Sequence, residues 1–554
     1  MTGKDGHIDH TVDRFIRERG AQCAYKVFTK TQIAWYLMLF AVLVFLFLYD
    51  WLYALTIVNF IAASFYFSVI VYKCAVVLLS VFRKREIVVM PEQIASLIEE
   101  ELPMYTVLIP LYKEPEVASK IIRHIDAMDY PKDKLDVKLL LEEGDDATIN
   151  AVNSAVLPHY YHVIIVPHSL PKTKPKACNH GLEAATGEYL VIFDAEDRPE
   201  PDQLKKAVYA FKAQPENVAC IQAKLNYFNP YTNTLTRWFT MEYTAWFDLY
   251  LPGLHAMGVP IPLGGTSNHF KTSVLRELGG WDPFNVTEDC DLGVRLHAEG
   301  FRTKVLDSTT WEEANSRLGN WIRQRSRWVK GYFQTHLVHM RNPIGLLVRL
   351  GPKDFASFLL TVGGLSVMLV LNPLYWLIGL AYLGLLISDF VAGHDAASAL
   401  AWKMLYTDPT DDPFWSGISI TFFIVTWVLV CANLLFIFVN VLACHARDYK
   451  RLIPLAFLSP LYWVLISVAA LKGFWQLFTN PFYWEKTVHG LDGDSHEASQ
   501  PVPEVVYWPE VVQSEADSAE AVSEADQQHA EASPPREPES EGQGDSPAAT
   551  QEQP

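Results

Sequence analysis

Long apolar runs on either side of a more polar segment constrain the fold of this chain more than any other feature. The run 33–49 is almost wholly apolar, and a second run covers 52–81 with only Lys73 interrupting it. Each run is long enough to cross a hydrocarbon core of roughly 30 Å as a helix. The sequence therefore predicts a transmembrane hairpin over residues 31–82.

Basic residues flank this hairpin on both sides. Arg83, Lys84 and Arg85 follow it, and the preceding segment 1–30 carries charges throughout and lacks the apolar core of a signal peptide. Because Lys and Arg favour the cytoplasmic side, both ends of the hairpin are expected there. The pattern predicts a multi-pass protein of the cell (inner or plasma) membrane, with the segment after the hairpin in the cytoplasm.

The chain becomes apolar again after residue 350. Runs at about 355–371, 375–391, 417–443 and 452–478 predict a membrane domain over 355–480. It has about four spans if "LNPLYW" (371–376) forms a turn. Four spans return the C-terminus to the cytoplasm but place the loop with Arg447, Lys450 and Arg451 outside, against the preference of basic residues. A single crossing over 355–391 reverses both placements.

The net charge of −18 comes mostly from the C-terminal tail. Residues 491–554 contain 16 acidic residues and one basic residue, which leaves about −3 for residues 1–490. This tail is rich in Glu, Ser, Pro, Gln and Ala, so it is expected to be disordered. The nearly neutral body excludes no substrate class by its charge. The seven Cys lack paired spacings and are expected to be free thiols.

Residues 100–318 have the pattern of a soluble α/β domain. Strand-like runs such as "YTVLIPL", "VKLLLE", "HVIIVP" and "YLVIF" alternate with helical stretches such as "PDQLKKAVYAFKA". This alternation predicts βαβ units and a mostly parallel sheet that is buried on both faces. Ligands of such sheets bind beyond the carboxyl ends of the strands.

Acidic residues follow two of these expected strands. Glu142 and Glu143 follow "VKLLL", where a carboxylate can bind a base or ribose, although an ordinary acidic turn explains them equally well. In "FDAED", Asp194 and Glu196 are two residues apart, so in an extended chain their carboxylates leave the same face. Such a pair suits Mg²⁺ or Mn²⁺ with a diphosphate. The alternative is a solvated helix cap.

Two further motifs lie later in the chain. "GGTSNHF" (264–270) offers glycines for a close approach to a ligand, and Thr287-Glu288-Asp289 precede a helix at whose start an ionised Asp289 can act as a base. Plain capping by Thr287 explains the second motif equally well. In a helix over 319–345, Trp321, Gln324, Arg325 and Trp328 share one face. That face suits phosphate and a sugar ring, or a membrane surface.

Two weaker signals complete the set. The lysines of "KTKPKACNH", among them Lys176, are candidates for an anion site, although a solvated basic loop is the plainer interpretation. Trp484 in "WEKT" follows the last apolar run, where an aromatic residue at the membrane interface is also expected.

The order of these motifs between membrane segments resembles that of membrane-embedded family 2 glycosyltransferases, the group of cellulose synthase, hyaluronan synthase and related processive β-glycan synthases. The resemblance covers roughly residues 100–345 and the flanking spans. The motifs that carry it are "VLIPLYKEP", "EEG", "KPKACN", "FDAED", "GGTSNHF", "TEDCD" and "QRSRW". It implies a GT-A fold for residues 100–318, inserted between transmembrane helices, and an interfacial helix over 319–345 that carries Q-x-x-R-W.

The resemblance also implies roles for individual residues. Asp194 and Glu196 would be the D-x-D pair that holds Mg²⁺ or Mn²⁺, with Glu in place of the second Asp. The donor site would comprise Glu142, Glu143, Lys176, Asp194 and Arg327. Asp289, beside Glu288, would deprotonate the acceptor hydroxyl. The acceptor site would comprise Gly265, Thr266, Gln324, Arg325 and Trp328.

The implied function is an inverting, metal-dependent transferase that uses a UDP- or GDP-linked sugar to polymerise a β-linked polysaccharide and move it through the membrane. Its expected partners are the growing glycan, the lipid membrane and, for export, further proteins, whereas no nucleic acid is expected. Two alternatives stay open. One is a transferase that adds a single sugar to a lipid carrier, and the other is a non-catalytic scaffold or receptor that keeps the fold.

Overall fold

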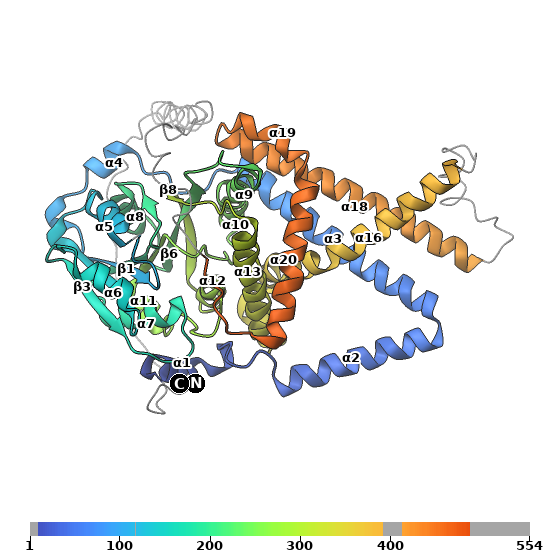
Figure 1. The fold of residues 1–554 in the computed structure, drawn as a ribbon, viewed down its shortest axis with the longest axis horizontal. Helices are drawn as coiled ribbons and strands as arrows, with labels where there is room; N and C mark the ends of the chain where they lie inside the picture. The colour runs from blue at the N-terminus through green and yellow to red at the C-terminus, as the bar shows by residue number, and fades with distance from the viewer. Residues whose placement is uncertain (1–8, 117, 392–412, 488–554) are drawn as a thin grey trace, which may run out of the picture. The chain divides into compact units, whose positions relative to one another are not determined.

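A computed structural model of the 554-residue chain describes residues 9–116, 118–391 and 413–487 (Figure 1). The acidic tail 491–554 lies outside the described residues. The strands are β1 (Tyr105–Leu111), β2 (Leu135–Glu142), β3 (Tyr161–Val166), β4 (Tyr189–Ile192), β5 (Arg198–Pro199), β6 (Val218–Tyr227), β7 (Asn268–Lys271) and β8 (Arg302–Glu312).

The α-helices fall into three groups along the chain. Before the sheet come α1 (His10–Arg19), α2 (Lys30–Tyr49), α3 (Trp51–Phe82) and α4 (Pro91–Ala95). Among the strands lie α5 (Ala118–Asp126), α6 (Asp146–Asn153), α7 (Lys174–Glu183), α8 (Gln203–Ala213), α9 (Thr234–Thr244), α10 (Leu251–Met257), α11 (Thr272–Glu277) and α12 (Glu288–Ala298). After the sheet come α13 (Leu318–His339), α14 (Pro343–Leu350), α15 (Pro352–Phe358), α16 (Gly364–Val391), α18 (Pro413–Ala446), α19 (Ile453–Ala456) and α20 (Ser459–Thr479).

The eight strands form one mixed sheet in the order β3-β2-β1-β4-β7-β6-β8-β5. The first four strands are parallel, as the sequence predicts, and β6 pairs in parallel with β8. The short strand β7 runs antiparallel between β4 and β6, and β5 runs antiparallel to β8. The α/β fold class is therefore confirmed, with a sheet less uniformly parallel than expected.

Both faces of the sheet are covered. Side chains alternate between the faces of a strand, so Val107 and Ile109 of β1 enter one apolar core while Leu108 enters the other. One core includes residues of α5 and α8, and the other includes residues of α7, α9, α10 and α12. Coverage on both sides leaves the carboxyl ends of the central strands as the place where loops can build a site.

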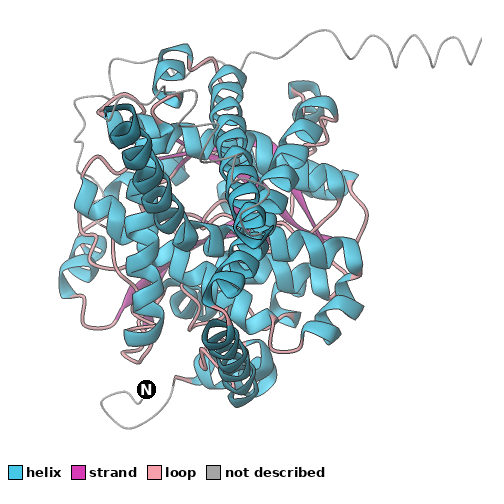
Figure 2. Ribbon diagram, turned by 90° about the vertical axis from the view of Figure 1, so that its right-hand side faces the viewer, coloured by secondary structure: helices cyan, strands magenta, loops and turns pink. Residues whose placement is uncertain are grey.

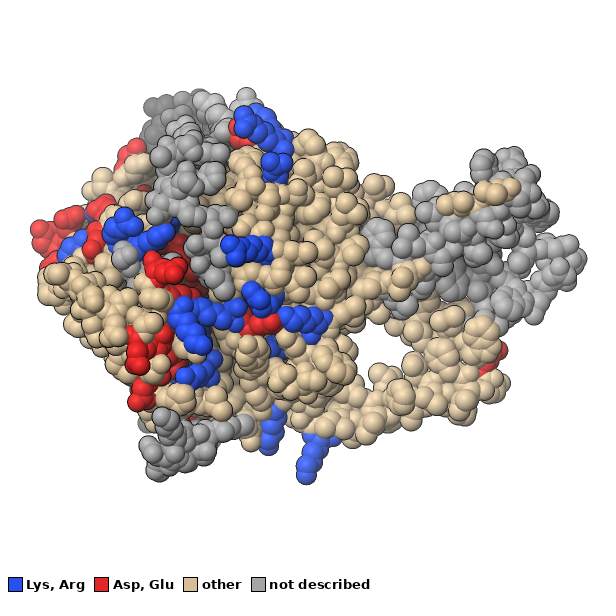
Figure 3. All heavy atoms as spheres, viewed as in Figure 1, with Lys and Arg blue, Asp and Glu red and all other residues tan. Residues whose placement is uncertain are grey.

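Among the described residues, four helical segments are long and apolar enough to cross a membrane, namely Lys30–Tyr49, Tyr53–Phe82, Pro352–Pro373 and Ser459–Thr479. The expected hairpin is formed by α2 and α3, which meet at Asp50. Its apolar side chains, among them Leu37, Phe45 and Phe60, are exposed. On the face shown in Figure 3, charged side chains gather over the α/β domain and are sparse over α2.

The expected turn at 371–376 is absent. One uninterrupted helical segment runs from Pro352 to Val391 through α15, the π-helical turn Leu359–Gly363 and α16, with Pro373 inside α16. A proline removes one backbone hydrogen bond, and long apolar helices tolerate this loss because neighbouring groups satisfy the freed carbonyl. The prediction of two spans split at this proline is therefore wrong for the helix itself.

Helix α20 lies along α13 and is held by hydrogen bonds near both of its ends, to α9 of the α/β domain at one end and to α13 at the other. Beside its first turns, Trp238 donates to the carbonyl of Leu455 (3.2 Å) and the Tyr462 hydroxyl donates to Glu242 (2.6 Å). Just beyond its last residue, Lys330 donates to the carbonyls of Asn480 (3.2 Å) and Tyr483 (2.8 Å). Figure 2 looks from the side of the long apolar helices, with the strands behind them.

Candidate active site

The "FDAED" loop begins where β4 ends, at the centre of the sheet. Asp194 and Glu196 are half-buried and line a cavity, whereas Ala195 and Asp197 between and after them are buried. Asp197 accepts hydrogen bonds from the backbone N of Asp194 (2.8 Å) and from the Thr266 hydroxyl. It therefore shapes the loop from inside and ties it to "GGTSNHF", while Asp194 and Glu196 face the cavity together.

Negative charge is in excess at this end of the cavity. Of the six acidic residues that line the cavity, Glu242 pairs with Arg325, and the other five are Asp194, Glu196, Glu288, Asp289 and Glu312. Lys174 compensates part of this charge, because its Nζ contacts Asp194 and donates to the carbonyl of Gly265 (2.8 Å). Burial, and then the charges of Asp197, Glu196 and Asp194, hold the pKa of Glu312 well above its usual range. Crowded oxygen ligands with unfavourable repulsion fit a divalent cation such as Mg²⁺ or Mn²⁺.

Helix α12 places the next two acids on the same cavity. Glu288 and Asp289 form its first turn, where the helix dipole favours negative charge. The backbone N of Cys290 donates to Asp289 Oδ1 (2.7 Å), and a Cβ added at Gly265 would lie 3.5 Å from Asp289 Oδ2. The glycine therefore leaves open space in front of the free carboxylate oxygen of Asp289.

The pKa values of these two acids are raised. Burial raises the pKa of Asp289 to about 6, and burial with the neighbouring Asp289 charge raises that of Glu288 to about 8. A carboxylate with a pKa near 6 is ionised at neutral pH and is more basic than an ordinary Asp, as a general base requires.

We expect kcat/KM to depend on pH through Asp289. Because only the ionised form can accept a proton, the rate constant should fall about tenfold per pH unit below about 6 and level off above it. Initial rates at low donor concentration between pH 4.5 and 8 measure this profile. A rate constant that stays flat down to pH 4.5 would exclude a base with this pKa.

Helix α13 supplies the opposite wall. The Trp328 ring stacks on Tyr243 of α9 with ring centroids 6.0 Å apart, and Gln324 accepts from the Asn315 amide (2.9 Å). Arg325 forms an ion pair with Glu242 and lies over the Trp328 ring (4.8 Å). The expectation that Gln324, Arg325 and Trp328 share one face of this helix is confirmed. Most of the side chains of α13 are buried within the protein.

A glycine sets the distance between α13 and the Glu288-Asp289 pair. A Cβ at Gly331 would lie 2.7 Å from the backbone N of Thr287, and closer still to the Thr287 side chain. We expect Gly331→Ala to shift α12 against α13, because overpacking of this kind costs about 1–3 kcal/mol of stability. The shift displaces Glu288 and Asp289 and should lower activity. Gly319→Ala in the same helix meets nothing within 4 Å and is the matched control. Equal activity of the two variants would contradict this close approach.

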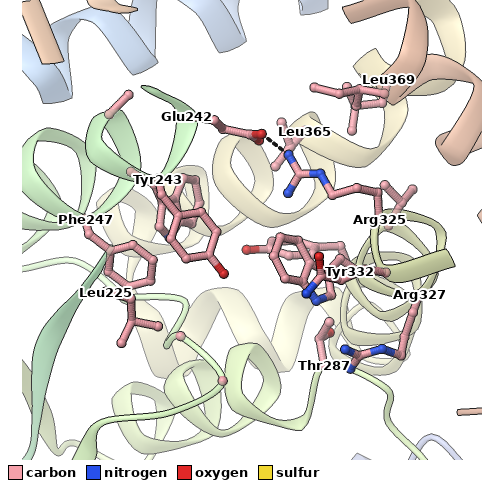
Figure 4. Close-up of a pocket in the computed structure, with 18 of the residues that line it drawn as sticks. Leu225, Glu242, Tyr243, Phe247, Thr287, Arg325, Arg327, Tyr332, Leu365 and Leu369 are labelled. Carbon is pink, nitrogen blue, oxygen red and sulfur yellow. Dashed lines mark ion pairs between the residues drawn. The ribbon is translucent and has the colours of Figure 1, made fainter. Parts of the chain in front are cut away.

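These residues converge on one cavity of about 300 Å³. In Figure 4, Leu225, Tyr243 and Phe247 face Arg325, Tyr332 and Arg327 across it, and the Glu242–Arg325 ion pair bridges it beside Leu365 and Leu369. The lining continues beyond this pair to side chains of the apolar helices, namely Tyr66 and Lys73 of α3, Asn372 of α16 and Asn433 and Asn440 of α18. One continuous space therefore connects the carboxylates with the apolar helices.

Three of the expected donor-site residues do not line the cavity. Lys176 is buried and forms an ion pair with Glu142 (3.1 Å), while Glu143 accepts from the backbone N of His168 (2.8 Å). These contacts lie at the end of β2, which β1 separates from β4 and the "FDAED" loop. The other expected residues, from Asp194 and Glu196 to Gly265, Thr266, Glu288, Asp289, Gln324, Arg325, Arg327 and Trp328, all line the cavity.

Other cavity residues lie outside the donor and acceptor sites that the resemblance implies, although Lys174 belongs to the candidate anion segment "KTKPKACNH". Lys174, and not Lys176, reaches Asp194, while Glu312 ends β8 beside the acids. Trp484 also lines the cavity, and Arg327 lies over its ring at 4.3 Å. Trp484, which was expected as an aromatic residue at the membrane interface, therefore lies against Arg327 in the wall of the cavity.

Comparisons with known proteins agree with this geometry. Residues 103–331 match the family described as "Glycosyltransferase like family 2". The chain is 29% identical over 239 residues to the probable glycosyltransferase YdaM of Bacillus subtilis, covering 42% of this chain and 56% of that protein. It is 32% identical over 239 residues to the probable glucomannan 4-beta-mannosyltransferase 7 of rice (Oryza sativa subsp. japonica), covering 42% and 41%.

A third relative, the beta-monoglucosyldiacylglycerol synthase of Trichormus variabilis, is 25% identical over 281 residues, covering 49% of this chain and 58% of that protein. Among solved structures, a mannosyltransferase from Pyrobaculum calidifontis in complex with GDP-Man and Mn²⁺ is similar, with a TM-score of 0.36 and 19% identity over 66% of this chain and 98% of that chain. The chain spans about half the length of the relatives that it matches.

Proposed function

We propose, from the premise that residues 103–331 are a family 2 glycosyltransferase domain, that the protein polymerises a β-linked glycan from a nucleotide sugar and moves it along the cavity. The observation that carries the proposal is the continuity of this cavity, from Asp194 and Asp289 at the sheet to asparagines on the apolar helices. A transferase that releases its product into water has no need of the second half of the cavity, the part lined by the apolar helices.

The donor would bind at the acidic end. Asp194 and Glu196 would hold Mg²⁺ or Mn²⁺, which when bound neutralises charge on the diphosphate. Lys174 and Arg327 lie among the same carboxylates and can bind the phosphate oxygens, with Arg offering fixed bidentate geometry. Glu142 and Glu143, at the end of β2, stay candidates for the base or ribose, with Lys176 acting through its ion pair with Glu142.

Chemistry would proceed by in-line displacement. The acceptor hydroxyl oxygen attacks the anomeric carbon, its proton passes to Asp289, and the bond to the diphosphate breaks with the electron pair leaving on the phosphate. Because attack comes from the face opposite the leaving group, an α-linked donor gives a β-linked product. The raised pKa of Asp289, about 6, suits this proton transfer at neutral pH.

The acceptor would lie across the middle of the cavity. The stacked rings of Trp328 and Tyr243 offer a flat surface for a sugar, and Gln324 and Arg325 offer hydrogen-bond donors. Deeper in, the amides of Asn372, Asn433 and Asn440 suit sugar hydroxyls better than acyl chains. These amides are the reason to propose a glycan in this half of the cavity, whose lining also includes apolar residues such as Met368, Leu369 and Phe436.

The membrane arrangement also belongs to the proposal. We place α2, α3, α16 and α18 across the membrane and α20 along its cytoplasmic surface. In support, α20 is held to α9 of the α/β domain at one end and to α13 at the other, and its outward apolar residues recur at heptad spacing, at Leu461, Val464, Val468, Leu471, Trp475 and Phe478. Arg447 binds Asp248 of the α/β domain (2.7 and 2.9 Å), so its basic loop would lie inside.

This arrangement predicts the side on which Arg451 is accessible. Arg451→Cys, in a Cys431→Ser background, should react with a membrane-impermeant maleimide in inverted vesicles and not in right-side-out vesicles, because Arg451 is exposed near the α/β domain. Labelling only in right-side-out vesicles would place this loop outside, as the alternative with four spans within residues 355–480 requires.

The donor is identified by incorporation of radiolabelled sugar into membranes that contain the protein. UDP-glucose, UDP-N-acetylglucosamine and GDP-mannose cover the two bases and three common sugars. Incorporation from one donor, lost in the Asp289→Asn variant, supports the transferase. A labelled product that partitions into organic solvent would instead favour transfer of a single sugar to a lipid, and silence with every donor would favour the scaffold.

A further inference from the structure

A cluster of two histidines and two carboxylates joins the N-terminal helix to α7, outside the candidate active site. Its members are Asp9 and His10 at the start of α1 and His180 and Glu183 in the last part of α7. We propose that these four residues bind a divalent transition-metal ion of the zinc type. None of them lines the cavity described above.

The ligand atoms already converge. One nitrogen or oxygen each from Asp9, His10 and His180 lie within 4.8 Å of one another. Asp9 Oδ2 lies 2.9 Å from His180 Nε2, and His10 Nε2 lies 2.7 Å from Glu183 Oε2. The two imidazole rings meet edge to face with centroids 5.0 Å apart. Two ring nitrogens and one Asp9 oxygen therefore surround one position, and Glu183 Oε2 lies beside His10, from where it can complete the ligand set.

Local structure holds these groups in place without an ion. Asp9 caps α1 with Oδ1, which accepts from the backbone N (2.9 Å) and hydroxyl (2.6 Å) of Thr11, so that Oδ2 faces His180 and the Ser169 hydroxyl (3.4 Å). His180 and Glu183 are three residues apart on α7 and share one face of the helix. Asp9 and His180 are buried, whereas the His10 side chain is largely exposed. A fixed, buried carboxylate such as that of Asp9 orients a histidine at a metal site, whereas Glu183 is exposed.

The ligand types select the metal. Imidazole nitrogens suit Zn²⁺, Co²⁺ and Ni²⁺, and two nitrogens with two carboxylate oxygens suit tetrahedral Zn²⁺. The carboxylates Asp194 and Glu196 offer only oxygen and suit Mg²⁺ or Mn²⁺ instead. Arg14 occupies Glu183 Oε1 (2.7 Å) and leaves Oε2 available. In the absence of the metal, the same groups form two histidine–carboxylate pairs.

The position of the cluster gives the ion a structural consequence. Helix α7 begins at Lys174, whose Nζ contacts Asp194 and the carbonyl of Gly265 in the cavity. An ion at the cluster fastens α1, which precedes the transmembrane hairpin, to the other end of this helix. The bound metal should therefore protect α1 from proteolysis.

Zinc stoichiometry tests the proposal directly. The full-length protein in detergent, with any affinity tag removed, is stripped with chelator, incubated with Zn²⁺ and dialysed. We expect the wild type to retain one zinc per chain and to give the visible absorption of four-coordinate Co²⁺ when cobalt is supplied. His10→Gln should weaken binding at least about tenfold. His159→Gln, an exposed histidine whose ring packs on Tyr160, is the matched control and should bind like the wild type.

Limited trypsin digestion provides the second readout. Zn²⁺ should slow cleavage after Arg14, Arg17 and Arg19 in the wild type and in His159→Gln, but not in His10→Gln. Equal zinc content in the three proteins, or loss of zinc from all of them on dialysis, would overturn the site. The Asp289→Asn variant should retain its zinc, so the result does not depend on the proposed transferase activity.

Discussion

Asp289→Asn is expected to reduce glycosyl transfer by about 10²–10⁴-fold, the usual contribution of a general base, while donor binding stays largely intact. The carboxamide keeps the size of the side chain and can still accept from the Cys290 backbone N, but it cannot take the proton of the acceptor hydroxyl. Transfer rates and donor binding by calorimetry, measured on the same preparation, separate the two effects.

Asp146→Asn is the matched control for this variant, because Asp146 also lies in the first turn of a helix, α6, but is exposed. It should transfer sugar like the wild type. If Asp289→Asn retained wild-type transfer, Asp289 would not be the base, and Glu288 would be the next group to examine. If it lost donor binding as well, the defect would lie in the fold of the site.

Removal of divalent metal with excess chelator is expected to abolish transfer, and Mg²⁺ or Mn²⁺ should restore it. The reason is the excess of carboxylates around Asp194, which repel a diphosphate unless a cation is present. Glu196→Gln removes one proposed ligand and should raise the metal concentration that gives half-maximal activity by at least about tenfold, equivalent to 1.4 kcal/mol.

The Asp197→Asn variant distinguishes the role of Asp197 from that of its neighbour Glu196. Asp197 is buried, accepts from the Asp194 backbone N and the Thr266 hydroxyl, and has a pKa held well above its usual range by burial and then by Asp194 and Glu196. Its loss should lower the thermal stability of the loop without shifting the metal requirement. If Asp197→Asn raised the metal concentration for half-maximal activity more than Glu196→Gln does, Asp197 and not Glu196 would be the metal ligand. Full activity in excess chelator would remove the metal from the proposal.

Local patterns could place many of the site residues. Asp194 and Glu196 follow a strand and are two residues apart, so their shared direction follows from the extended backbone, and the structure has them on one cavity. The spacing of Trp321, Arg325 and Trp328 predicts a shared helix face, which the contact of Arg325 with both rings confirms. In both cases the information lies within one element.

Other features depend on where elements begin and on contacts between distant segments. The choice between Lys174 and Lys176 depends on the start of α7, since two residues along a helix turn a side chain to a different face. The pair of Arg325 with Glu242 joins α13 to α9 and has no signal in either segment. Helix α20 has the length and apolar composition of a span, and only its contacts with Glu242 and Lys330 reveal that it lies along the α/β domain.

The size of the product tests the central claim most directly. Membranes with the wild-type protein are supplied with the radiolabelled nucleotide sugar that supports incorporation, and the product is separated by gel filtration before and after digestion with a β-glycan hydrolase. The proposed function predicts a polymer of many sugars that is degraded by the β-specific hydrolase and is absent with Asp289→Asn. A product of one added sugar, or one resistant to β-specific hydrolases, would contradict it.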